Sequence, residues 1–154
     1  MKIPVGELMR CMGLMITGAE NSTPYLKYLN IKKLDFTVDS LKYIDEYLLK
    51  IRKIKKKLNN DEILLIIVRC GTYLGEVVRK PNPKKFSWMT YESACKVGGK
   101  FIKSLGKNIQ NCYVLYDGKT FYFPLSKPWK FIDEGSSQSL WGFAKVALDK
   151  NLNY

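Results

Sequence analysis

The chain has 154 residues, with 26 Lys and Arg against 14 Asp and Glu, and it contains no histidine. The missing histidine excludes Ser-His-Asp triads, Cys-His pairs and His-ligated metal sites. The net charge of +12 suits nucleic acid or an acidic protein, but only four of the 26 cations are arginine, the residue preferred for base recognition.

Residues 1–33 are predicted to be a helix and linker attached to a single domain over 34–154. Apolar residues recur at helical spacing between Val5 and Met12, and the stretch that follows contains the Gly and Pro residues of a loop. Regular apolar periodicity begins at Leu34. We therefore expect an N-terminal appendage followed by one domain, a division that suits a chain of this length.

Two helices are predicted at the start of this domain. Apolar residues at three- and four-residue spacing predict an amphipathic helix over 38–58, and an aliphatic run predicts a second helix over 63–78. Gly71 and Gly75 lie four residues apart on one face of the second helix, where another segment can approach closely. The short turn between the helices predicts an antiparallel helical hairpin.

A strand over 86–89 and a helix over 91–105 are predicted next. Thr90 stands where its side chain can cap this helix. The apolar stripe that we expect to face the core consists of Ala94, Val97, Phe101 and Leu105.

Residues 112–123 contain two strand-like runs separated by Asp117 and Gly118. This dipeptide is typical of a two-residue type I′ hairpin, in which Tyr116 would face Lys119. Both faces of the hairpin carry apolar or aromatic side chains, so each face must be covered or used for binding.

Two more helices complete the prediction, a short one that begins at Ser126 and ends at Gly135 and another over 137–148. Together these elements predict an α+β fold, in which a helical hairpin and covering helices pack on a small, mainly antiparallel β-sheet.

Basic residues form two candidate binding surfaces. Lys96, Lys100 and Lys103 make a stripe on the helix over 91–105, and a second group of cations occupies 50–57. Such surfaces can contact phosphates or an acidic protein, and they are equally typical of solvated helix faces. No zinc-finger pattern accompanies either surface.

The second helix of the hairpin carries Arg69, Tyr73, Glu76 and Arg79 on one side. A carboxylate and guanidinium groups beside a glycine-lined face can bind a polar ligand or assist proton transfer. They can also form a structural ion pair, because Glu76 and Arg79 lie three residues apart. Glu76 has no evident catalytic partner in the sequence, which disfavours an enzyme.

Tyr113 and Tyr122 lie in the predicted hairpin and are candidate anchors of a protein interface, although core packing explains them as well. The four cysteines lack Cys-x-x-Cys spacing, so they predict free thiols in a reducing cytoplasm rather than a zinc site. The sequence contains no cofactor-binding motif and no apolar run near the ~20 residues that span a bilayer.

Residues 34–37, 69–77, 123–125 and 130–132 together resemble a group of small, largely uncharacterised bacterial domains. These domains share a Gly-x-Tyr-Leu-Gly-Glu-Val helix, which corresponds here to residues 71–77, and the similarity covers roughly 34–148. Members of the group often look like immunity proteins, which bind and neutralise an antibacterial toxin domain in the cytoplasm. The resemblance implies no catalytic residue.

The leading hypothesis is a cytoplasmic immunity protein that needs no metal or cofactor and binds a cognate toxin domain. Complementary potentials favour association, so the positive charge predicts an acidic contact surface on the toxin. Two alternatives stay open: a basic nucleic-acid-binding protein, and a small-ligand-binding protein or enzyme that uses Glu76 and Arg69. Affinity that falls steeply with salt would indicate the first alternative, and a deep pocket around Glu76 the second.

Overall fold

The computed structural model describes residues 2–18 and 21–152, the last three of these by their backbone only. Within these ranges the chain forms six α-helices and one three-stranded antiparallel sheet, which confirms the predicted α+β fold.

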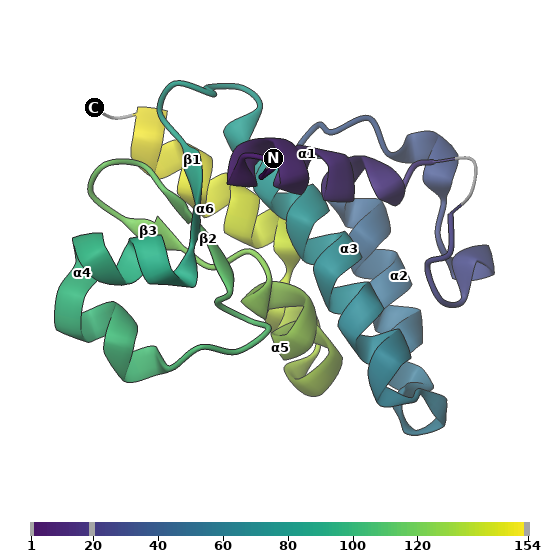
Figure 1. The fold of residues 1–154 in the computed structure, drawn as a ribbon. Coiled ribbons are helices and arrows are strands. Elements are labelled where there is room, and N and C mark those ends of the chain that lie inside the picture. Colours follow the sequence, from purple (N-terminus) through teal and green to yellow (C-terminus); the bar gives the residue numbers. More distant parts are fainter. Residues whose placement is uncertain (1, 19–20, 153–154) are drawn as a thin grey trace.

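Helices α2 (Leu41–Lys53) and α3 (Asn60–Arg79) form the predicted helical hairpin, and α1 (Val5–Met15) lies across α3 (Figure 1). Helices α5 (Ser126–Glu134) and α6 (Leu140–Leu152) both pack against the hairpin. The sheet lies beside these helices, and α4 (Tyr91–Leu105) covers its outer side (Figure 1).

The hairpin differs from the prediction mainly at its turn. Helix α2 ends at Lys53, because residues 55–57 form a 3-10 turn instead of continuing the helix. Helix α3 begins with a capping box, in which the Asn59 side chain accepts the N–H of Glu62 at 2.8 Å and the Glu62 carboxylate accepts the N–H of Asn59 at 3.1 Å. This cap sets the start of α3 three residues before the predicted position.

Gly71 and Gly75 mark the face of α3 where other elements come closest. A Cβ built on Gly71 would lie 2.7 Å from the Cα of Leu125, the residue before α5, and a Cβ on Gly75 would overlap the indole ring of Trp88. The predicted close approach is therefore confirmed at both glycines, with backbone at one and an aromatic ring at the other.

The N-terminal residues contribute to the same core as the rest of the chain. Met9 and Ile16 are fully buried, and they belong to one cluster with Tyr47, Tyr73 and Phe131. The boundary at residue 34 stays a prediction, but side chains on both sides of it pack together.

Strands β1 (Ser87–Thr90), β2 (Tyr113–Tyr116) and β3 (Phe121–Tyr122) pair in that order. The predicted hairpin register is wrong, because Tyr116 pairs with Phe121 rather than with Lys119. The cause is the Asp117 carboxylate, which accepts the backbone N–H groups of Lys119 at 2.9 Å and Thr120 at 2.7 Å and so closes a longer turn.

The register moves by two residues, so the two faces of the hairpin stay as predicted. Val114 and Phe121 pack with α4 in a small separate cluster, whereas Leu115 and Tyr122 belong to the main core. The sheet therefore joins α4 to the rest of the molecule.

We predict that Gly71→Ala lowers the free energy of unfolding by about 1–3 kcal/mol, because the new methyl group has no space against the backbone at Leu125. Gly142→Ala in α6 is the control. Its Cβ would meet Ser139 at an ordinary 3.6 Å, so the higher helix propensity of alanine stabilises the protein by up to about 1 kcal/mol. Urea unfolding measures both; equal stabilities would contradict the packing at Gly71.

Candidate functional site

Arg69 is buried and holds the loop that follows α1. Its guanidinium donates to the hydroxyl oxygens of Thr23 at 3.2 Å and Ser22 at 3.1 Å. Burial lowers the pKa of this arginine. With 5% of its surface exposed, Arg69 joins α3 to the loop rather than presenting its charge to a partner.

Tyr73 is fully buried one turn further along α3. Its hydroxyl oxygen accepts the backbone N–H of Phe36 at 2.9 Å and shares a hydrogen bond of 2.6 Å with the Ser40 hydroxyl. The ring packs against that of Phe36, with 4.5 Å between centroids, and burial raises the pKa of the phenol. Tyr73 therefore fixes the chain that enters α2.

Glu76 and Arg79 form the predicted ion pair, and Trp88 joins it. Glu76 Oε2 accepts from Arg79 Nε at 2.6 Å and from the Trp88 indole N–H at 3.1 Å, while Oε1 accepts from Arg79 Nη2 at 2.9 Å. The Glu76 side chain is 4% exposed, and its hydrogen bonds raise the pKa of Arg79. This cluster ties α3 to β1.

The two candidate tyrosines of the sheet also face inward. Tyr122 is 8% exposed, packs edge-on against Phe86 and Phe143, and donates its hydroxyl hydrogen to Asp117 at 3.1 Å. Tyr113 is half-buried against the main core. Neither tyrosine stands out from the surface as an interface anchor.

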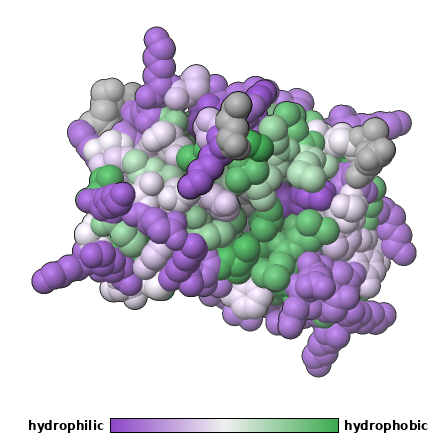
Figure 2. Space-filling view, in the orientation of Figure 1, coloured by the Kyte–Doolittle hydropathy of each residue, from purple (hydrophilic) through white to green (hydrophobic). Residues whose placement is uncertain are grey.

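The candidate lysines of α4 are exposed, unlike the candidate residues of α3 and of the sheet. Lys96, Lys100 and Lys103 are all exposed. Thr90 caps the helix as predicted, because its hydroxyl oxygen accepts the N–H of Ser93 at 3.2 Å. On the side of the molecule where Figure 1 places α4, hydrophilic side chains project from the surface (Figure 2).

The predicted orientation of α4 is wrong for three of its apolar side chains. Val97, Phe101 and Leu105 were expected in the core, but they are 51%, 59% and 41% exposed. For Phe101 and Leu105 the reason is Gly99, whose φ of 55° and ψ of −131° interrupt the helix and rotate its second half. Ile102 becomes the buried residue of that half. Val97 lies before this break, and nothing in the structure explains its exposure.

A second, partly apolar surface lies between α5 and the turn that joins α2 to α3. Trp129, which is 40% exposed, and Ile63 line a slot of about 290 Å³ together with Lys55 and Lys56. Figure 2 shows apolar surface between the positions of α5 and α3. Asp133 lies in the same slot, 3.9 Å from Lys55, so an acid already offsets part of its positive charge.

No family model, curated protein or solved structure matches this chain. In the part of the chain that the structure describes, none of the helices has both the length and the apolar character needed to cross a bilayer. The described residues also contain no group of three or more Cys, Asp or Glu side chains placed to hold a metal ion.

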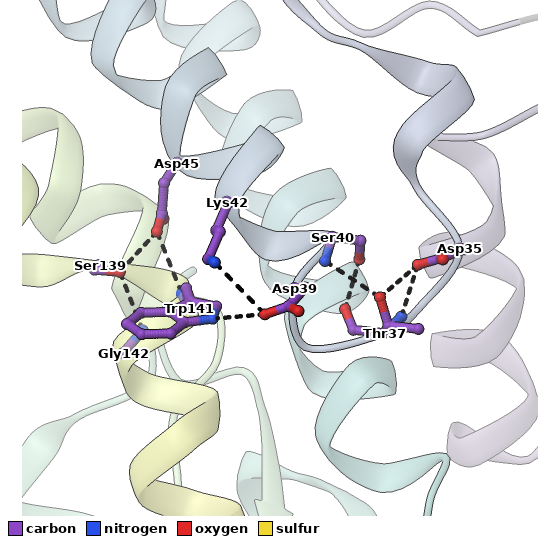
Figure 3. Close-up of polar contacts among 9 residues, drawn as sticks. All are labelled: Asp35, Thr37, Asp39, Ser40, Lys42, Asp45, Ser139, Trp141 and Gly142. Atoms are coloured by element: carbon purple, nitrogen blue, oxygen red, sulfur yellow. Dashed lines mark hydrogen bonds and ion pairs between the residues drawn. The ribbon is translucent and has the colours of Figure 1, made fainter.

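Asp45 is an organising residue that the sequence analysis did not single out (Figure 3). Its carboxylate accepts the N–H of Leu140 at 2.8 Å, the hydroxyl of Ser139 at 2.6 Å and the N–H of Trp141 at 3.3 Å. Burial raises the pKa of Asp45, although these hydrogen bonds oppose the shift. The sequence offers one sign of this role, because Asp45 is an acidic residue that directly follows the core residue Ile44.

A neighbouring polar cluster shapes the start of α2 (Figure 3). Asp35 accepts the N–H of Thr37 at 3.1 Å, and the Thr37 hydroxyl oxygen accepts the N–H of Ser40 at 3.3 Å. Asp39 accepts from the Trp141 indole at 3.3 Å and lies 3.7 Å from Lys42. The Asp39–Trp141 contact joins this segment to α6, and the other contacts fix the segment itself, so we assign both clusters to the fold rather than to a binding site.

We predict that Glu76→Gln lowers the free energy of unfolding by about 2 kcal/mol, because Arg79 then loses a charged partner in a nearly buried position. Glu46→Gln on the exposed side of α2 is the control and should change it by less than about 0.5 kcal/mol. Urea unfolding compares them. If the two variants were equally stable, the Glu76 pair would have no structural role.

Proposed function

We propose that this protein binds another protein through α4 and that the partner is an antibacterial toxin domain, which it neutralises by stoichiometric binding. The observation that carries the binding proposal is the surface of α4, where three exposed apolar side chains alternate with three exposed lysines. A contiguous exposed apolar surface with a polar rim is typical of interfaces. The immunity role and the cytoplasmic location follow from the resemblance to immunity proteins.

The positive charge around α4 favours a partner with an acidic contact surface. Over residues 91–130 there are seven lysines and two acids, and both acids are already engaged. Glu92 pairs with Lys107, and Asp117 accepts the N–H groups of its own turn. An acidic toxin surface would approach α4 under attraction, whereas a basic nuclease domain would be repelled.

Nucleic acid is the second candidate, and one observation favours it. Phe101 is 59% exposed between Lys100 and Lys103, so its ring can stack on a base while the lysines contact phosphates. An enzyme or ligand-binding protein that used Arg69 and Glu76 would first have to break the contacts that hold these side chains at 5% and 3% exposure.

We predict that reversing the α4 charge in Lys96→Glu/Lys100→Glu/Lys103→Glu slows association with the product of the adjacent gene, where we expect the toxin domain, by roughly tenfold or more at low salt. The dissociation rate should change less, because electrostatic steering acts on encounter. Surface plasmon resonance over a range of ionic strengths measures both rates, and rescue of cells that express the toxin measures neutralisation.

The matched control is Lys32→Glu/Lys33→Glu/Lys84→Glu, which changes the net charge equally at exposed positions outside α4. This variant should lose at most a few-fold in association rate. Equal slowing in both variants would remove α4 from the interface. Tight binding to RNA or DNA, with none to the toxin domain, would replace the proposed function by the nucleic-acid alternative.

A further inference from the structure

A groove of about 320 Å³ lies between the second half of α4 and the start of α5. Phe101 and Leu105 form its α4 side, and Phe123 and Lys130 line it from the segment around α5. Side chains of Asn108 and Gln110 add a polar wall. The groove thus combines apolar side chains that reach solvent with amides that can hydrogen-bond to a bound backbone.

Two backbone features build this groove. The break at Gly99 turns Phe101 outward, and Gly106, with φ of 68°, ends α4 and directs the chain back past the groove. Asn111 then fixes the returning loop, because its side chain donates to the Gly106 carbonyl and accepts the N–H of Asn108 at 2.9 Å. The polar wall is therefore held in place by the protein itself.

The charge around the groove has one sign. Lys100 and Lys103 flank Phe101 in the sequence, and Lys130 lies in the lining. Among the described residues, no carboxylate pairs with any of these three lysines. The slot beside Trp129 differs in this respect, because it contains Asp133.

We propose that this groove binds a segment of the partner protein in which one large apolar side chain is flanked by Asp or Glu. The apolar side chain packs against Phe101 and Phe123, and the carboxylates pair with Lys100, Lys103 and Lys130. This inference rests on the proposed function for its partner but makes a separate statement, namely which surface is used and which peptide chemistry it selects.

The test is selection of random 12-residue peptides on the full-length protein, followed by fluorescence anisotropy of the enriched peptides. We expect enrichment of peptides with two or more acidic residues beside Phe, Trp or Leu. Their affinity should fall about tenfold or more in Phe101→Ala and in Lys130→Glu. Both side chains are exposed, so neither variant should impair folding.

Val146→Ala is the control, because Val146 is 57% exposed on α6 and does not line the groove. Its peptide affinity should match that of the unchanged protein. Failure to enrich acidic, apolar peptides, or equal affinity for Phe101→Ala, would overturn the inference. Displacement of the peptide by a single-stranded oligonucleotide, or by anionic but not neutral lipid vesicles, with weaker affinity for the peptide itself, would also overturn it.

The two proposals fail separately. If peptide binding required Phe101 but the toxin domain did not bind, the proposed function would be wrong and the proposal for the groove would still hold. Toxin binding that is the same in the unchanged protein and in Phe101→Ala would support the function and remove the groove from it.

Discussion

Close packing on the glycine face of α3 is the constraint on which the rest of the structure depends. Gly71 admits the backbone that starts α5, and Gly75 admits the indole of Trp88 from β1. The Trp88 N–H then reaches Glu76, which also holds Arg79. A larger residue at Gly71 would push away the start of α5, and a larger residue at Gly75 would push away β1, whose sheet positions α4.

Polar side chains that stabilise the fold lie on α3, whereas the surface that we propose for binding lies on α4. On α3, the side chains of Arg69, Tyr73 and Glu76 are buried and hydrogen-bonded inside the molecule. Helix α4 instead packs through a small cluster of Ala94, Ile102 and Val114, and it leaves Phe101 and three lysines in solvent. Substitutions on its outer side can therefore change a partner's affinity without a large loss of stability.

Local patterns predicted most of the fold and only part of the candidate site. The apolar period and the two glycines of α3 were sufficient for that helix and its close contacts. Local patterns did not predict the geometry of the hairpin turn, because the carboxylate of Asp117 decides between a two-residue and a four-residue connection. The prediction that the second half of the apolar stripe on α4 faces the core was also wrong, because helical spacing assumes an unbroken helix and Gly99 breaks it. The roles of Arg69 and Asp45 depend on contacts with residues 46 or more positions away in sequence, which no local pattern encodes.

Amide hydrogen exchange on the complex with the toxin domain tests the central claim, binding through α4, most directly. Exchange should slow on binding over residues 96–112 and 126–131, which contain the α4 surface and the groove beside it, and should stay unchanged in α1. Protection confined to α1 or to the hairpin of α2 and α3, with none in α4, would contradict the account.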